Sequence, residues 1–322
     1  MRLGGREYAA GLFLLLLFVA INLTGCQKNG DNQTNNSPAA GATAAFPMTI
    51  NDDLGRQVTL PAEPQRIVSL APSNTEIIYY LGLGDRLVGD TTYCDYPAEA
   101  KLVAKVGGFK DPSLEKIVVM KPDLVLATGM HEQLIKSLED AGLTVIALKP
   151  KSVENIIDSI QLIAQVAGVE NRGVALTNGL KERVELVSQK VGSVPQAQKP
   201  TVYYELWYEP LMSVGPDSMI GHLIKLSGGI NIAEDSAEQY PQLSEEVIIA
   251  KNPQVMFNSY GHDAKKVTAA EISAREGWQN VAFVKSGRIF TIESDCLTIA
   301  GPRIVEGLEQ MAAYLYPDRF IK

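Results

Sequence analysis

Two stretches of the sequence decide the fold: Leu114-Glu-Lys-Ile-Val-Val-Met-Lys-Pro-Asp-Leu-Val-Leu126 and Glu245-Glu-Val-Ile-Ile-Ala-Lys-Asn-Pro-Gln-Val-Met-Phe257. In each, a glutamate lies seven residues ahead of a proline, and the proline opens a short apolar run. The glutamates, Glu115 and Glu246, are 131 residues apart, and so are the prolines. Because a repeat at a fixed offset marks a repeated structural unit, the sequence predicts two similar α/β lobes.

Short runs of branched apolar residues, typical of buried parallel strands, recur in both halves of the chain. They are Arg66–Leu70, Leu87–Gly89, Asp123–Ala127, Leu143–Leu148, Val202–Leu206, Ile230–Ile232, Gln254–Phe257 and Arg288–Ile292. Helical patterns separate them. Cap motifs predict some of the helix starts, among them a capping box at Ser73–Glu76 and a cap and proline at Asp111–Pro112. This alternation predicts the α/β class, with each sheet covered by helices on both faces.

The first 25 residues have the pattern of a secretory signal peptide. Arg2 and Arg6 precede the apolar run Ala9–Ile21, and Leu23-Thr-Gly-Cys26 follows. This last motif resembles the bacterial lipobox, in which the cysteine is acylated and the chain is cut just before it. An ordinary signal peptide with a chance cysteine is the alternative. We expect lipidation at Cys26.

The rest of the chain is expected to have four parts. Residues 26–46 are polar and rich in turn formers, which predicts a flexible tether. An N-terminal α/β lobe is predicted over residues 47–169, a connecting helix over residues 170–192 and a C-terminal α/β lobe over residues 193–322. An anchored and tethered body would lie at the outer face of the cytoplasmic membrane, on its periplasmic or extracellular side, where a membrane partner is within reach.

The composition predicts a large core and argues against a polyanionic partner. Of 322 residues, 46% are apolar, and 29 basic against 37 acidic residues give a net charge of -8. Removal of the leader would make the charge -9. A negative chain without a basic patch is poorly suited to nucleic acid.

Aromatic residues share the offset of the repeat. Phe109 and Tyr240 each lie six residues before a glutamate of the pair, where a hydrophobic staple of the helix start is one interpretation. Tyr93 follows one predicted strand, and Trp207 and Tyr208 follow another. Ligands of open α/β sheets bind beyond the carboxyl ends of the strands, so we expect an aromatic cleft between the lobes.

Glu115 and Glu246 admit two interpretations. Each falls in the first turn of a predicted helix, where the helix dipole stabilises a carboxylate. If a rough twofold relates the lobes, however, the two charges form a matched pair suited to two cationic sites on a symmetric partner.

Signals for catalysis are weak. His131, His222 and His262 lie in unrelated contexts without a hydrolase, zinc or phosphate-loop motif, and no clustered metal ligands occur. A surface α/β hydrolase using His131 or His262 remains the alternative from another class. We expect Cys94 and Cys296 to be free thiols; a bridge between them, or coordination to a metal in the ligand, is the alternative.

Several motifs together resemble the cobalamin and iron-siderophore binding proteins of bacterial ABC importers, the cobalamin branch above all. The resemblance covers most of the chain, in order. Its motifs are Arg66-Ile-Val-Ser-Leu-Ala-Pro-Ser-Asn-Thr-Glu-Ile-Ile78, Tyr93-Cys-Asp-Tyr-Pro97, Leu114–Ala127, Tyr240-Pro-Gln-Leu-Ser-Glu-Glu246, Ser294-Asp295 and Gly301-Pro-Arg303.

The resemblance implies two Rossmann-like lobes joined by a single long helix, as in helical-backbone receptors for metal chelates, with a shallow cleft and little closure. It implies that Glu115 and Glu246 dock onto arginines of a permease dimer that works with an ATPase. Tyr93, Phe109, Tyr240 and Asp295 fall at its pocket positions, whereas Trp207 and Tyr208 come from the strand-end argument alone. Phe109, Tyr240, Thr128 and Cys296 stand where cobalamin binders usually have tryptophan.

The expected activity is capture of a cobalamin-like corrinoid by a lipid-anchored monomer without catalysis or a cofactor of its own. A corrin ring has a broad apolar face and amide side chains, which suit aromatics and a few hydrogen-bonding groups. A ferric siderophore or haem is the alternative ligand. A trianionic siderophore would call for arginines, of which the predicted cleft loops have few.

Overall fold

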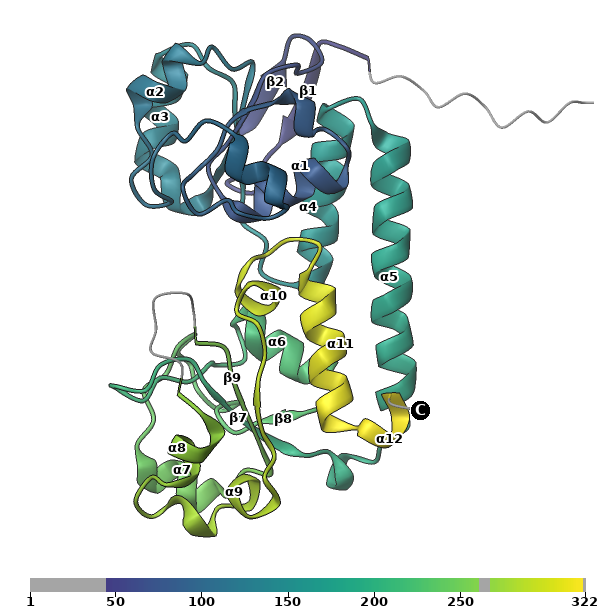
Figure 1. The fold of residues 1–322 in the computed structure, drawn as a ribbon. Coiled ribbons are helices and arrows are strands. Elements are labelled where there is room, and N and C mark those ends of the chain that lie inside the picture. Colours follow the sequence, from purple (N-terminus) through teal and green to yellow (C-terminus); the bar gives the residue numbers. More distant parts are fainter. Residues whose placement is uncertain (1–44, 261–266, 321–322) are drawn as a thin grey trace, which may run out of the picture. The chain divides into compact units, whose positions relative to one another are not determined.

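The computed structural model describes residues 45–260 and 267–320 (Figure 1). Every described residue belongs to one compact unit, within residues 41–322. The predicted signal peptide, Cys26, most of the tether and His262 lie outside the described residues. Among the helices in the described part, none has both the length and the apolar character that crossing a bilayer requires.

The first sheet has four parallel strands in the order β4-β3-β5-β6. They are β3 (Ile67–Ser69), β4 (Leu87–Gly89), β5 (Leu124–Thr128) and β6 (Val145–Leu148). Alternate side chains enter two apolar clusters, because successive residues of a strand point to opposite faces. One cluster contains α1 (Pro72–Tyr80) and α4 (Val153–Val166), and the other contains α2 (Leu114–Val119) and α3 (Glu132–Asp140).

The second sheet repeats this arrangement with the order β10-β9-β7-β8, again parallel. Its strands are β7 (Thr201–Glu205), β8 (Ile230–Asn231), β9 (Val255–Asn258) and β10 (Ile289–Thr291). One face packs on α6 (Met219–Leu226) and α11 (Ile304–Leu315), and the other on α7 (Glu245–Lys251), α8 (Ala269–Ser273) and α9 (Ala282–Ser286). Counted along the chain, both sheets have the strand order 2-1-3-4. The predicted α/β class with two related lobes is confirmed.

The longest described helix, α5 (Glu170–Gly192), runs between the segments that form the two sheets. It packs against α4 on one lobe and α11 on the other (Figure 1). Close packing on α4 depends on Gly173, because a Cβ there would lie 2.4 Å from the Cβ of Ala164. The α5 helix therefore joins the lobes through side-chain packing as well as through the chain.

The remaining elements are short. They are the 3-10 turns η1 (Gly84–Arg86), η2 (Ala98–Leu102), η3 (Gly129–His131), η4 (Gln196–Gln198) and η5 (Trp278–Asn280) and the helices α10 (Asp295–Thr298) and α12 (Pro317–Phe320). An antiparallel hairpin of β1 (Met48–Asn51) and β2 (Gln57–Leu60) precedes the first sheet and was not predicted. Asp52 attaches it to β6 by accepting a hydrogen bond from the backbone N–H group of Ala147.

The helix starts predicted from the motifs at Ser73–Glu76 and Asp111–Pro112 were wrong by a few residues. Helix α1 begins at Pro72 after an extended Ala71 without a side-chain cap, because proline already has the helical φ. The capping box at Ser73–Glu76 does not form. Helix α2 begins at Leu114, capped by Ser113, because Pro112 still pairs with Gly107 in an isolated bridge.

Candidate functional site

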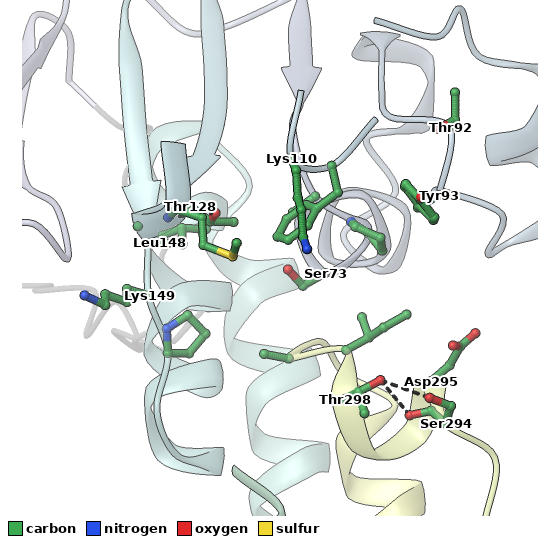
Figure 2. A pocket seen from close by; sticks show the side chains of 18 of the residues that line it. Ser73, Thr92, Tyr93, Lys110, Thr128, Leu148, Lys149, Ser294, Asp295 and Thr298 are labelled. Atoms are coloured by element: carbon green, nitrogen blue, oxygen red, sulfur yellow. Dashed lines mark hydrogen bonds between the residues drawn. The ribbon is translucent and has the colours of Figure 1, made fainter. Parts of the chain in front are cut away.

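A cavity of about 1220 Å³ lies at the carboxyl ends of the strands of the first sheet (Figure 2). The loops that follow β3, β4, β5 and β6 line it, together with the segment 294–300 that follows β10. Four parallel strands end at one edge of the sheet, so their loops meet there. The cavity therefore has one wall from each lobe.

The wall from the first lobe has exposed apolar side chains beside charged ones. Tyr93, with 60% of its surface exposed, and the half-buried Phe109 lie along it. Met130, 65% exposed, continues the apolar surface. Exposure of this much apolar surface in one concave site is typical of a site for an apolar ligand.

His131 holds the loops of this wall together. Its Nδ1 atom accepts a hydrogen bond from the backbone N–H of Thr128 at 3.1 Å, so Nε2 carries the proton and donates it to the carbonyl oxygen of Phe109 at 2.7 Å. The edge of one ring also meets the face of the other, with 5.4 Å between the centroids of Phe109 and His131. A buried imidazole with both nitrogens engaged is a structural brace and is poorly placed to act as a general base.

Replacing His131 by alanine is expected to lower the free energy of unfolding by about 2 kcal/mol, because a backbone donor and a backbone acceptor lose their partner. Urea denaturation measures this loss. The control is His222→Ala, since the partly buried His222 contacts a largely exposed carboxylate, that of Glu154 at 3.3 Å, and this contact should contribute less than about 1 kcal/mol. Equal losses in the two variants would contradict a bracing role.

The wall from the second lobe is polar at one end. Ser294, Asp295 and Thr298 lie on one turn, and the Thr298 hydroxyl donates a hydrogen bond to the backbone oxygen of Ser294 at 2.9 Å (Figure 2). Asp295 is also 3.4 Å from Nη2 of Arg303. This wall therefore presents hydroxyls and a carboxylate opposite the wall from the first lobe.

Behind this wall, Arg303 forms an ion pair with Glu76 of α1. The Nη2 and Nε atoms of Arg303 donate to Oε1 of Glu76 at 2.5 and 3.1 Å. Burial raises the pKa of Glu76 to about 7, and Asp295 and Glu306 add to the rise, although Arg303 opposes it.

This raised pKa predicts a pH-dependent stability. Between pH 4.5 and about 7 the folded protein keeps a proton on Glu76 that the unfolded chain releases, so stability falls as the pH rises through this window. The loss is expected to reach about 3 kcal/mol. Urea unfolding at pH 5 to 8 should show a weaker fall in Glu76→Gln; parallel curves for the two proteins would contradict the prediction. Burial also raises the pKa of Asp90, to about 6. Asp90 therefore lowers the stability with rising pH in the same direction, both in the unmodified protein and in Glu76→Gln.

Three of the residues proposed for the ligand do not line this cavity. Trp207 is half exposed and donates its Nε1–H to the carbonyl oxygen of Glu209. Tyr208 lies against the guanidinium of Arg275, 4.0 Å from its ring centroid, and Tyr240 is exposed. The structure thus brings together Tyr93, Phe109 and Asp295 and leaves Trp207, Tyr208 and Tyr240 outside the cavity.

Sequence reasoning missed other residues of the cavity. Met130, Lys149 and Pro150 follow directly after the predicted strands, so the strand-end rule could have found them. Lys110 next to Phe109 also lines the cavity.

Glu115 and Glu246 occupy equivalent places in the two lobes. Each is exposed in the first turn of its helix, directly after a serine cap and one further residue. A hydrogen bond from Ser244 lowers the pKa of Glu246. Exposed apolar side chains accompany them, Val119 in α2 and Val247 in α7.

The described cysteines, Cys94 and Cys296, are both buried and free. Burial raises the pKa of Cys296 to about 11, so its thiol is protonated at neutral pH. Within residues 45–260 and 267–320, no group of three or more His, Cys, Asp or Glu side chains could hold a metal ion.

Comparison with known proteins gives consistent matches. A family described as periplasmic binding protein matches residues 67–296. An uncharacterised ABC transporter substrate-binding lipoprotein of Bacillus subtilis is 35% identical over 97% of this chain and 98% of its own length. A vitamin B12-binding protein of Vibrio cholerae is 30% identical over 79% of this chain and 90% of its own length.

Solved structures agree with these sequence matches. The periplasmic vitamin B12-binding protein of Vibrio cholerae superposes with a TM-score of 0.67 at 28% identity, over 80% of this chain and 99% of its own. A periplasmic haem-binding protein in complex with two haems gives a TM-score of 0.72 at 25% identity, over 80% of this chain and all of its own.

Proposed function

Since the chain belongs to the periplasmic binding protein family, we propose that it is a lipid-anchored solute-binding protein that captures a cobalamin-like corrinoid and delivers it to an ABC permease. The cavity carries the ligand part of this proposal. Its volume of about 1220 Å³ exceeds the roughly 300–1,000 Å³ of ordinary small-molecule pockets, which favours a bulky ligand.

The chemistry of the walls supports a corrinoid. Tyr93, Phe109 and Met130 offer an apolar surface to the face of a corrin ring, and the hydroxyls of Ser73 and Thr298 can bond its peripheral amides. Vitamin B12-binding relatives in sequence and in structure support the same ligand class.

A haem or a ferric siderophore is the second candidate. The solved relative with two haems and the exposed phenol of Tyr93, an oxygen ligand for iron, favour it. Against a trianionic siderophore, the lining of the cavity contains two lysines, Lys110 and Lys149, and three carboxylates, Asp95, Asp111 and Asp295. The lining residues therefore lack the excess of positive charge that a strongly anionic ligand requires.

The remaining parts of the proposal follow from the sequence. Acylation of Cys26 would anchor the chain on the outer face of the cytoplasmic membrane, through a tether that ends near residue 46. Glu115 and Glu246 would dock the two lobes onto arginines of the permease dimer. The protein would act as a monomer, with the corrinoid as cargo and without a cofactor of its own.

A catalytic function has less support. Relatives named for their activity are binding proteins. Of the two histidines considered for a hydrolase, His131 has both ring nitrogens in hydrogen bonds to the backbone, and His262 lies outside the described residues.

Thermal unfolding with a panel of ligands tests the proposed function. A ligand that binds only the folded state, at one hundred times its Kd, stabilises it by about 2.7 kcal/mol, and a shift of several degrees in Tm follows. Cyanocobalamin should produce this shift, whereas haem and a ferric siderophore should not. A shift with only haem or the siderophore would support the second candidate, and no shift with any of them would contradict the proposal.

A further inference from the structure

Arg303 is a buried arginine at the junction of the two lobes. It precedes α11 directly and is 6% exposed. A buried guanidinium needs partners for its charge and for its donors, and these partners come from both lobes.

Three groups surround the guanidinium. Oε1 of Glu76 accepts from Nε at 3.1 Å and from Nη2 at 2.5 Å. Oδ2 of Asp295 lies 3.4 Å from Nη2. The ring of Tyr96 stacks on the guanidinium, with 3.9 Å between its centroid and Cζ.

Each partner belongs to a segment that lines the cavity, although Arg303 does not line it. Glu76 lies in α1, whose first residues Pro72 and Ser73 line the cavity. Tyr96 follows the lining residues of the loop after β4, and Asp295 lines the cavity itself. Figure 2 shows Ser73 and Tyr93 on one side of the cavity and Asp295 on the other.

We propose that Arg303 is a positioning residue for the ligand, which fixes the two walls of the cavity relative to each other and orients Asp295. This inference rests on the proposed function. It assigns Arg303 no contact with the ligand. The planar guanidinium group of Arg303 contacts α1, the loop after β4 and α10 at once. The ammonium group of a lysine is a compact point charge and would lack that geometry.

A double-mutant cycle in ligand affinity tests the proposal. Arg303→Lys and Asp295→Asn are each expected to weaken cyanocobalamin binding by about tenfold. The loss of affinity in the double variant should be no larger than the larger of the two single losses. Calorimetry gives the affinities. Additive losses, about a hundredfold in the double variant, or an unchanged affinity in Arg303→Lys would overturn the proposal.

The matched control is Arg183→Lys. Arg183 also donates two hydrogen bonds to one carboxylate, Glu309, at 2.8 and 2.7 Å, and it also joins two helices, α5 and α11. Because neither residue lines the cavity, this variant should keep the affinity of the unmodified protein. A loss equal to that of Arg303→Lys would show a general effect on folding and would overturn the positioning role.

Amide hydrogen exchange without ligand gives a second reading. In Arg303→Lys, faster exchange is expected in residues 92–97 and in residues 295–299, with α3 and α9 unchanged. Unchanged exchange in those two segments would overturn the proposal. If the unmodified protein binds no ligand of the panel, the proposed function fails, and the exchange data alone still decide whether Arg303 holds the two walls.

Discussion

Replacing Glu115 and Glu246 together by alanine is expected to abolish stimulation of the permease's ATPase and to leave the affinity for cyanocobalamin unchanged. Both carboxylates are exposed, one on each lobe, and neither lines the cavity. Charge pairs at protein interfaces have coupling energies of about 1.5–7 kcal/mol, so the loss of two should weaken docking by at least about a hundredfold. ATPase assays with the permease in liposomes measure the effect.

The control for this variant removes two similar charges. Glu132 and Glu245 also lie in the first turns of helices, one in each lobe, and the variant with alanine at both has the same net charge. It should stimulate the ATPase normally. If the Glu115 and Glu246 variant also stimulates normally, the two glutamates only stabilise their helix starts.

The aromatic residues in the wall from the first lobe should contribute much of the free energy of ligand binding. Tyr93→Ala is expected to weaken cyanocobalamin binding by about thirtyfold, because truncation of an aromatic that packs against a ligand commonly costs 2 kcal/mol or more. The phenol is 60% exposed, so its loss should scarcely change the stability of the fold. Calorimetry for affinity and thermal unfolding for stability separate the two effects.

Trp207→Ala is the matched control for Tyr93→Ala. Trp207 is an exposed aromatic that follows a strand of the second lobe, but it does not line the cavity. Its variant should bind within about threefold of the unmodified protein. A loss at Trp207 as large as that at Tyr93 would place the ligand elsewhere, against the second lobe.

The strands could be predicted because each is a short run of almost exclusively apolar residues, which can be recognised from the local sequence alone. The eight predicted runs correspond to the eight strands of the two sheets, since a strand buried on both faces is a continuous apolar run. The hairpin β1–β2 was missed because it has one buried and one exposed face and few residues. Helix starts were misplaced where a proline and an isolated bridge replaced the expected caps.

The site was predictable only in part. The rule that ligands lie at strand ends led to Tyr93 and Phe109, but it gives no information on how far a loop extends, and Trp207 and Tyr240 do not reach the cavity. The contact between Glu76 and Arg303 spans 227 positions of the chain. No local pattern predicts such a contact, because it depends on how the two lobes pack.

Isothermal titration of the purified protein with cyanocobalamin, beside haem and a ferric siderophore, tests the central claim most directly. We expect one cyanocobalamin per chain with a submicromolar Kd, and a far weaker or undetectable heat with the other two ligands. Submicromolar binding of only haem or the siderophore, with none of cyanocobalamin, would contradict the assignment of this cavity to a corrinoid.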